Sequence, residues 1–382
     1  MAITAQHPAS TAPSTFEAAE QVNSLLKDSG YPQSIEISPA AFAGRNDTWV
    51  MTLADHTKVF VKRFVSGASA ADAFERSLMH ESTITQVQGS HQTTPRVLAS
   101  DNNLKAIAFE YCAGTSVAHL LVDEMLPQNF ASMAAKVVAE LHNLPSDHLP
   151  ETKPVFGIVQ MLRHGIPKNR YVDLTLAELD LWSQLQQDEE LICAAEDLLS
   201  DEKQNLTAAI HGDLRLDQFY LNDEQLMLLD WEDFGRGDAA RDVGMMAGEW
   251  LYRSILDTVT SRGDGQRPPE KFNEQSATTL IAARMNEATV HIGNFWKTYK
   301  NNREASDPNL GLRATARLGW HLVERTIARA GMVSKLSGIE RAALSIGRRA
   351  LITPDAYQAA LGLGENTNES IDNSTSSRGI TV

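Results

Sequence analysis

The chain has 382 residues, of which 42% are hydrophobic and 22% charged, so it is not a wholly disordered protein. Its 34 Lys and Arg residues stand against 49 Asp and Glu residues, a net charge of −15. This acidity excludes a protein built to coat nucleic acid, and we expect no nucleic-acid partner. Two cysteines, Cys112 and Cys193, are too few for a disulfide framework or a four-cysteine zinc site.

The N-terminus lacks a basic segment followed by an apolar one, so it does not read as a signal peptide. No stretch approaches the roughly 18 uninterrupted apolar residues of a membrane helix. We therefore expect a cytoplasmic protein with reduced thiols and no membrane contact.

In chain order, residues 1–16 are rich in Ala, Ser, Thr and Pro and are expected to be disordered. Short apolar runs bounded by turn residues then predict strands, and one of them is followed by a helix whose apolar face includes Phe74, Leu78 and Ile84. The predicted strands are Ser34–Phe42, Thr48–Leu53, Lys58–Phe64 and Lys105–Tyr111.

From Gln128 onward the pattern is mostly helical, with one strand–turn–strand interruption at about 208–230. The polar residues 365–382 are expected to form a disordered tail. This order predicts an α+β, bilobal fold with a small antiparallel-sheet N-lobe, residues 17–111, and a larger, mainly helical C-lobe, residues 112–364. A cleft between two lobes is the natural place for a ligand.

Two charged residues occupy positions where apolar ones belong. Strand alternation places Lys62 on the same face as Phe60 and Phe64. Glu81 lies within the apolar stripe of the following helix. Each buried charge costs several kcal/mol unless it is paired, so we predict an ion pair between Lys62 and Glu81, the arrangement that holds ATP phosphates in kinase-like folds. The alternative is that Lys62 extends its ammonium to solvent and Glu81 sits at the edge of the stripe.

The segment after His211 carries the strongest chemical pattern. Two apolar runs flank the turn Asn222–Gln225, and folding them as a hairpin places Gln218 opposite Asp230. An amide and a carboxylate oxygen suit Mg²⁺. Asp213, just upstream, can accept the proton of an attacking hydroxyl, and Arg215 can neutralise charge on a transferring phosphoryl group. The alternative is a polar turn that ends in a strand-end aspartate.

These motifs make the chain resemble the aminoglycoside phosphotransferase/choline kinase superfamily. The pattern H-G-D-x-x-x-x-N corresponds to 211–218, I-D-W-[ED] to 229–232, and G-D-x-x-x-D to 237–242, with Gln218 in place of the usual Asn. The resemblance implies a protein-kinase-like fold that phosphorylates a hydroxyl group, with ATP and Mg²⁺ as cofactors. The implied nucleotide-binding residues are Gly44 and Asn46 in a covering turn, Lys62, Glu81, and Glu110 and Cys112 in the linker; the implied metal ligands are Gln218 and Asp230.

Three further residues match the superfamily without being predicted to react. We expect Asp238 and Asp242 to anchor loop backbone rather than to bind metal. We expect His142 to be a packed helix residue rather than a catalyst.

A narrower resemblance links the segments 44–49, 59–63, 211–218 and 248–251 to the kinase subunit of class V lanthipeptide synthetases. It implies phosphorylation of Ser or Thr in a ribosomal precursor peptide, ahead of elimination to dehydroamino acids. The lyase and cyclase would be separate chains, because no such segment is visible here.

Two charged segments are candidates for acceptor recognition. Residues 174–203 carry nine acidic residues and one lysine, and acidic surfaces attract aminoglycosides in antibiotic kinases of the superfamily. Residues 311–350 carry eight basic and two acidic residues, which fits an acidic leader peptide or a partner protein. Either segment can instead be a solvated helix face.

Three functions remain open at this point. The first is a peptide Ser/Thr kinase, and the second is a small-molecule kinase for an aminoglycoside, sugar or amino alcohol. The third is a nucleotide-binding scaffold without catalysis, for which the substitution of Gln218 is the main support.

Overall fold

The computed structural model describes residues 15–40, 46–65, 69–87, 93–152, 156–222, 225–256 and 274–364. It divides into two compact units, of which the first comprises 1–153, 205–242 and 262–265, and the second comprises 154–204, 243–261 and 266–382. Residues 1–14, 365–382 and Gly44 lie outside the described part. The first helix, α1 (Thr15–Asp28), begins two residues inside the segment that the sequence assigns to disorder.

An antiparallel five-stranded sheet with the order β1-β2-β3-β5-β4 forms the start of the first unit. In the register of the sheet, Lys62 of β3 pairs with Thr48 on one side and with Ile107 on the other. All four predicted strands are present, whereas β4 was not predicted. The strands are β1 (Ser34–Pro39), β2 (Asp47–Leu53), β3 (Lys58–Arg63), β4 (Val97–Asp101) and β5 (Ala106–Glu110).

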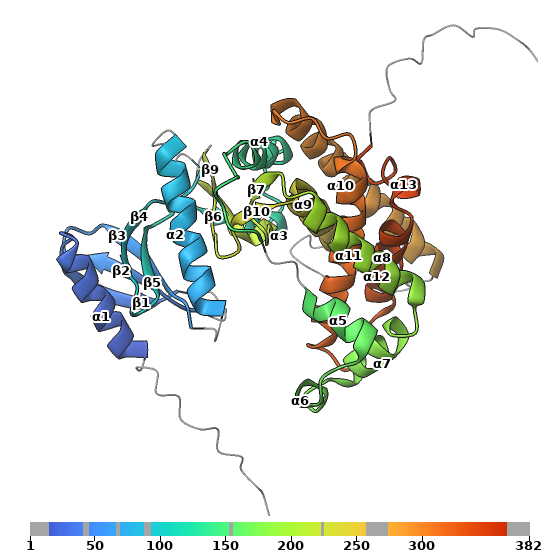
Figure 1. Ribbon diagram of the computed structural model, residues 1–382, viewed down its shortest axis with the longest axis horizontal. Helices are drawn as coiled ribbons and strands as arrows, with labels where there is room; N and C mark the ends of the chain where they lie inside the picture. The colour runs from blue at the N-terminus through green and yellow to red at the C-terminus, as the bar shows by residue number, and fades with distance from the viewer. Residues whose placement is uncertain are drawn as a thin grey trace, which may run out of the picture. The chain divides into compact units, whose positions relative to one another are not determined.

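The helices α1 and α2 (Ala70–Val87) cover the two faces of this sheet (Figure 1). On the α1 face, Val22 and Leu26 pack with Val59 and Val61, among other buried residues of the strands. On the α2 face, Phe64, Phe74 and Ile107 form a second cluster. Since neighbouring residues of a strand point to opposite faces, Lys62 belongs to the α2 face, as the alternation predicts.

The first unit also contains the hairpin predicted after His211. Strand β8 pairs with β9 on one side and with the linker strand β6 on the other, and β7 pairs with β10. Gly114 allows the linker to lie close to this hairpin, because a Cβ there would be 2.7 Å from the carbonyl oxygen of Leu221. These elements are β6 (Thr115–Ser116), α3 (Val117–Val122), α4 (Phe130–His142), β7 (Ala208–Ile210), β8 (Phe219–Asn222), β9 (Gln225–Leu228) and β10 (Gly235–Gly237).

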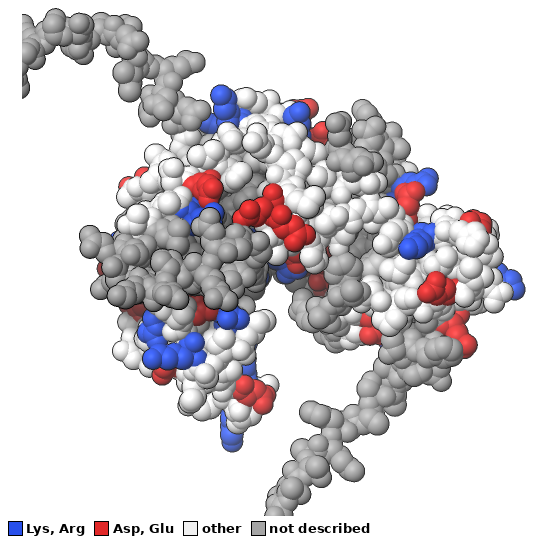
Figure 2. All heavy atoms as spheres, turned by 180° about the vertical axis from the view of Figure 1, so that it is seen from behind, with Lys and Arg blue, Asp and Glu red and all other residues white. Residues whose placement is uncertain are grey.

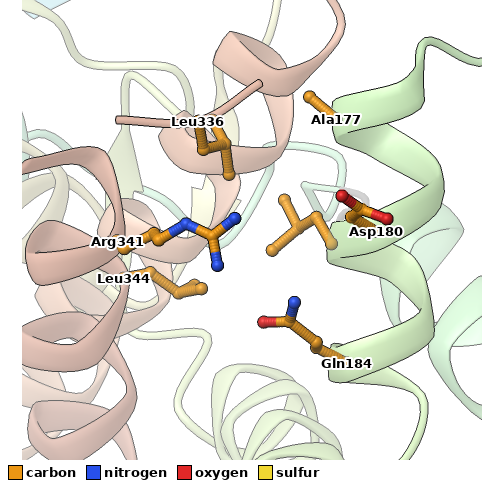
Figure 3. A pocket seen from close by; sticks show the side chains of 7 residues that line it. Ala177, Asp180, Gln184, Leu336, Arg341 and Leu344 are labelled. Atoms are coloured by element: carbon orange, nitrogen blue, oxygen red, sulfur yellow. The ribbon is translucent and has the colours of Figure 1, made fainter. Parts of the chain in front are cut away.

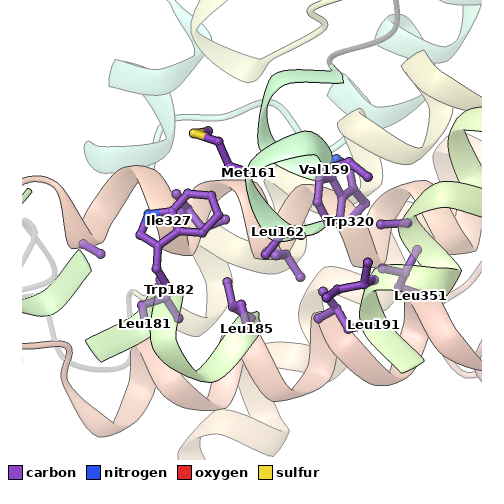
Figure 4. Packing of buried hydrophobic residues seen from close by; sticks show 14 of the residues in the cluster. Val159, Met161, Leu162, Leu181, Trp182, Leu185, Leu191, Trp320, Ile327 and Leu351 are labelled. Atoms are coloured by element: carbon purple, nitrogen blue, oxygen red, sulfur yellow. The ribbon is translucent and has the colours of Figure 1, made fainter. Parts of the chain in front are cut away.

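The second unit is helical, and α11 is buried along most of its length. Its core gathers Trp182, Trp320 and Ile327 with leucines of neighbouring helices (Figure 4). The helices are α5 (Phe156–His164), α6 (Lys168–Tyr171), α7 (Leu176–Leu185), α8 (Glu189–Gln204), α9 (Ala239–Leu256, whose first turn belongs to the first unit), α10 (Glu274–Asn302), α11 (Leu310–Ala330), α12 (Gly338–Ile352) and α13 (Pro354–Tyr357). Within the described ranges, no helix combines the length and apolarity needed to cross a membrane.

Candidate active site

The loop that begins at His211 is fixed by one buried carboxylate. Asp242 accepts hydrogen bonds from the backbone N–H groups of His211, at 2.7 Å, and Gly212, at 2.9 Å. Burial raises the pKa of Asp242, but the hydrogen bond to His142 and the backbone donors outweigh burial and hold it below its usual range. Asp242 is therefore a backbone anchor, and His142, whose Nε2 lies 3.1 Å from it, is buried and supports that anchor. The anchoring role expected of Asp242 and the packed position expected of His142 are observed, and Asp238 likewise accepts from the backbone N–H of Ala240 at 2.9 Å.

Gly212 gives the loop its sharp turn. Its φ of +86° lies in the left-handed region, and a Cβ there would be 2.7 Å from the carbonyl oxygen of Asp233. Only glycine meets both conditions without strain. The turn brings the next residue, Asp213, to the start of the hairpin.

The Asp213 carboxylate is one third exposed and has a cation beside it. Arg215 Nη1 lies 3.3 Å from its Oδ2, and the same guanidinium reaches Asp217 at 3.1 Å. Partial desolvation raises the pKa of Asp213; Arg215 opposes this, while the carboxylates of Asp233 and Asp230 add to it. A carboxylate of raised pKa that is open to solvent on one side is suited to accepting a proton.

Gln218 is buried at the base of the hairpin. The backbone N–H of Leu229 donates to its carbonyl oxygen at 3.0 Å, so the predicted register, with Gln218 next to Asp230 across the hairpin, is confirmed to within one residue. Its side-chain Oε1 accepts from the backbone N–H of Arg215 at 2.9 Å. An amide oxygen has two lone pairs, so this bond leaves Gln218 able to accept a second donor or a cation.

Lys62 pairs with two carboxylates of the segment after β9. Its Nζ contacts Asp230 and lies 2.9 Å from Glu232 Oε2. Burial lowers the pKa of Lys62, but the two carboxylates outweigh it and leave the pKa raised. For Asp230, burial raises the pKa and Lys62 reverses that effect, so both partners stay charged.

The predicted ion pair between Lys62 and Glu81 is therefore wrong. The buried positions of α2 are Phe74, Ser77, His80 and Thr83, three residues apart, and Glu81 falls beside this stripe instead of inside it. The apolar spacing in the sequence indicated a stripe shifted by about one residue, because it counted Leu78 as buried and His80 as polar. Glu232, and not Glu81, is the glutamate that pairs with Lys62.

Glu232 also reaches the predicted covering turn, where it accepts a hydrogen bond from Asn46 Nδ2 at 3.0 Å. Asn46 is thus linked to Lys62 through a shared carboxylate. Sequence reasoning missed Glu232 as a site residue, although it stands in the matched motif two residues after Asp230. Gly44, the other residue predicted in this turn, lies outside the described residues.

The linker residues lie at the end of β5. Glu110 is half exposed and pairs with Arg96 at 3.2 Å, so its side chain holds the sheet edge. Cys112 is partly buried, and desolvation together with Glu110 raises the pKa of its thiol to about 11, which keeps it protonated and unreactive. Nucleotide binding by the backbone of Glu110 and Cys112 stays a prediction.

The side chains fit a hard divalent cation. The structure shows no cluster of three or more His, Cys, Asp or Glu side chains in metal-binding geometry among the residues it describes. Mg²⁺, however, needs few protein ligands, and Asp230 and Gln218 supply a carboxylate and an amide oxygen. The carboxylates that raise the pKa of Asp213 also leave an excess of negative charge, which a cation would offset.

Three ion pairs join the two charged segments of the second unit. Arg348 bonds to Asp188 and Glu190, each at 2.8 Å, and Arg317 lies 3.4 Å from Glu202. Other ion pairs within this unit include Arg163 with Glu189 and Glu196, Arg313 with Asp307, Arg325 with Glu249, and Arg329 with Glu340. Acidic and basic side chains are interspersed on the face shown in Figure 2. Neither segment is the single-sign surface that its composition predicts.

Arg341 of the basic segment lies beside a small cavity. Its guanidinium points between α7 and α12, toward Asp180 and Gln184, in a pocket lined by Ala177, Leu336 and Leu344 (Figure 3). The cavity measures about 10 Å³. This is at most the space of one water molecule and cannot admit a peptide side chain or an antibiotic.

The chain is similar to one family of known proteins. The model of the phosphotransferase enzyme family matches residues 36–268, which include every described residue of the candidate site. Among curated proteins, none matches the chain by sequence.

The chain is also similar to solved structures of kinases. Amicoumacin kinase in complex with AMP-PNP, Ca²⁺ and Ami is 14% identical over 88% of this chain and 93% of that chain, with a TM-score of 0.51. A fructosamine-3-kinase from Thermobifida fusca YX-ER1, described as putative, is 16% identical over 87% and 98%, with a TM-score of 0.46. A choline/ethanolamine kinase family protein from Mesorhizobium loti is 14% identical over 91% and 100%, with a TM-score of 0.46. At such identities the first of these shows a common kinase-like fold and nothing about the substrate.

Proposed function

The chain belongs to the phosphotransferase enzyme family and acts on hydroxyl groups, and we propose that it uses ATP as the phosphoryl donor with Mg²⁺ as the metal. One observation carries the proposal. Lys62 of β3 contacts Asp230 at the end of the hairpin, while Asp213 lies at the start of the same hairpin. A cation for phosphate, a carboxylate for metal and a carboxylate for proton transfer are thus joined within one compact unit.

The reaction is an in-line transfer. The hydroxyl oxygen of the acceptor attacks the γ-phosphorus, the bond to the oxygen that bridges the β- and γ-phosphates breaks, and ADP leaves with that electron pair. Asp213 accepts the hydroxyl proton, and Arg215 offsets the charge on the transferring group. The family geometry assigns Lys62 to the α- and β-phosphates, where it would exchange part of its contact with Asp230 for phosphate oxygens.

Asp230 and the amide oxygen of Gln218 would hold the metal. Bound Mg²⁺ neutralises phosphate charge and orients the phosphates for attack. Release of Lys62 toward phosphate would free Asp230 for this role. The backbone near Cys112 would receive the adenine, as the superfamily resemblance implies.

For the acceptor we propose Ser or Thr of a ribosomal precursor peptide, with elimination of the phosphate carried out by a separate lyase. Support comes from the similarity of 44–49, 59–63, 211–218 and 248–251 to the kinase subunit of class V lanthipeptide synthetases. Arginines pair with Asp188, Glu189, Glu190, Glu196 and Glu202, which reduces the acidic charge available to a polycationic small-molecule acceptor. Of the basic residues in 311–350, Arg317 and Arg348 pair with this acidic segment, so peptide recognition does not rest on these two arginines.

The test incubates the protein with ATP labelled at the γ-phosphate, Mg²⁺ and an extract of the producing cells, and separates the products by size. The Asp213→Asn variant is the control for background kinases. Label in Ser or Thr of a peptide, dependent on Asp213, is expected. Label only in small molecules would overturn the peptide acceptor and keep the phosphotransferase, whereas equal labelling by both proteins would overturn the proposed role of Asp213.

A further inference from the structure

The helix α2 is attached to the metal-binding end of the hairpin by an aromatic stack. The rings of His80 and Trp231 lie 3.6 Å apart at an angle of 8°, and the ring of Phe234 meets His80 edge-on at 5.1 Å. His80 is 3% exposed and Trp231 is 7% exposed. The contact joins the buried stripe of α2 directly to the residue that follows Asp230.

Further contacts hold the same loop. Trp231 Nε1 donates to the hydroxyl of Thr94 at 2.9 Å. From α2, Arg76 donates to the backbone carbonyl of Phe234 at 2.8 Å and to that of Glu151 at 2.9 Å. Two residues of one helix thus contact loop 231–234, one through its ring and one through a guanidinium.

Asp230 needs such support because its backbone is strained. Its φ of +71° lies in the left-handed region, which non-glycine residues rarely adopt. A strained residue keeps its conformation only when its surroundings fix it, and strain of this kind is concentrated at functional sites. A peptide bond joins Asp230 to Trp231, so contacts that fix the position of Trp231 also restrict the backbone of Asp230.

In the protein-kinase arrangement, a glutamate of the corresponding helix pairs with the strand lysine. Here Lys62 pairs with the loop itself, at Asp230 and Glu232, and α2 reaches that loop through His80. The helix therefore acts on the metal-binding carboxylate and not on the lysine.

We infer that His80 is a positioning residue that holds Asp230 in its metal-binding conformation by stacking on Trp231. The inference rests on the proposed function in one respect, namely that Asp230 binds the metal. It assigns His80 no contact with substrate and no proton transfer.

The test measures ADP formation from ATP as a function of Mg²⁺ concentration. In His80→Ala the stack is lost, and we expect the Mg²⁺ concentration for half-maximal rate to rise about tenfold, the scale found when the support of a metal ligand is removed. In His80→Phe a ring of similar size remains, and the Mg²⁺ dependence should stay within about twofold of the wild-type protein, because rings of this size stack alike.

Thr83→Ala is the matched control, since Thr83 lies on the same buried stripe and its hydroxyl bonds only within α2, to the carbonyl of Met79 at 2.8 Å. It should lower thermal stability without changing the Mg²⁺ dependence. Equal Mg²⁺ curves for His80→Ala and Thr83→Ala would overturn the inference. So would a His80→Phe variant as defective as His80→Ala, because stacking would then not be the property that matters.

Hydrogen exchange separates this inference from the proposed function, since it needs no turnover. In His80→Ala the backbone amides of 231–236 should exchange faster than in the wild-type protein, while those of β8 remain protected. Unchanged exchange in that segment overturns the positioning role. A wild-type protein that forms no ADP overturns the proposed function and leaves the exchange result to decide the role of His80.

Discussion

At the scale of single residues, the site depends on backbone conformations that are costly for ordinary side chains. Gly212 adopts φ +86° and Asp230 adopts φ +71°. The first is relieved by the absence of a Cβ, and the second is held by Lys62 and by the Trp231 contacts. The motif His211-Gly212-Asp213 therefore has a physical reason for its glycine: another residue would strain the turn that brings Asp213 to the start of the hairpin.

The glycine argument predicts a large difference between two substitutions. Gly30 has the same φ of +86° but open space around its Cβ position, so Gly30→Ala isolates backbone strain, at about 1 kcal/mol. Gly212→Ala adds a collision with the backbone of Asp233 and should lower the free energy of unfolding by about 3 kcal/mol. Urea unfolding of both variants measures the difference. Equal losses would show that the close approach to Asp233 does not matter.

At the scale of elements, strands were easier to predict than the helix contact with the site. Alternation in Val59–Phe64 placed Lys62 on the correct face because a strand has a period of exactly two residues. The helix α2 was predicted, but the residues of its buried face were not. His80 was counted as polar, whereas its aromatic ring is buried against Trp231. Strand β4, Val97–Asp101, was missed because its residues do not alternate in polarity.

The partners of Lys62 show a second limit. Glu232 lies 170 residues after Lys62 in the chain, and local periodicity cannot predict a contact between residues so far apart. Motif spacing did predict the hairpin, its register and the position of Asp230, because these are local features. The parts of the site that could not be predicted are the contacts between distant segments.

The link between α9 and α11 has a pH dependence that follows from Glu249. Its carboxylate is buried and bonds to His321 at 3.0 Å, with Arg325 at 3.4 Å. Burial raises the pKa of Glu249, but His321, Arg325 and Arg253 outweigh burial and lower it to about 2. Because the folded-state pKa lies below the unfolded value of about 4.5, this group stabilises the fold above pH 4.5 and loses that contribution as the pH falls toward 2.

We therefore expect the wild-type protein to lose about 3 kcal/mol more stability than Glu249→Gln when the pH is lowered from 7 to 2.5. Urea unfolding of both proteins at the two pH values, followed by circular dichroism, gives the comparison. The difference between the proteins isolates this carboxylate from the others. An identical pH dependence would mean that Glu249 is not held ionised by its neighbours.

At the scale of the whole molecule, the net charge of −15 does not describe the local surfaces, because ion pairs join the most acidic segment to the most basic one. Residues 174–203 and 311–350 were predicted as two surfaces of opposite charge. In the structure some of their side chains form ion pairs, such as Arg348 with Asp188, which lie 160 positions apart in the chain. Composition reports the sign of a segment but not its partner.

Two neighbouring arginines, Arg348 and Arg349, test whether these ion pairs contribute to stability. Arg348 pairs with Asp188 and Glu190, whereas Arg349 is exposed and has no ion pair among the described residues. Solvent weakens the ion pairs of Arg348 because the side chain is partly exposed. Arg348→Ala should therefore lower the free energy of unfolding by about 1 kcal/mol, and Arg349→Ala should lower it by close to none. Thermal melting at low and high salt distinguishes them, since only the first loss should shrink with salt. Two equal losses would contradict the pairing.

The most direct test of the central claim compares Asp213→Asn with Asp217→Asn in Mg²⁺-dependent phosphotransfer from ATP. Both carboxylates contact Arg215, at 3.3 and 3.1 Å, but only Asp213 is assigned the hydroxyl proton. We predict that Asp213→Asn loses about 10³-fold in turnover and retains ATP binding by calorimetry, while Asp217→Asn stays within about fivefold of the wild-type protein. Phosphotransfer by Asp213→Asn at the wild-type rate would contradict the account.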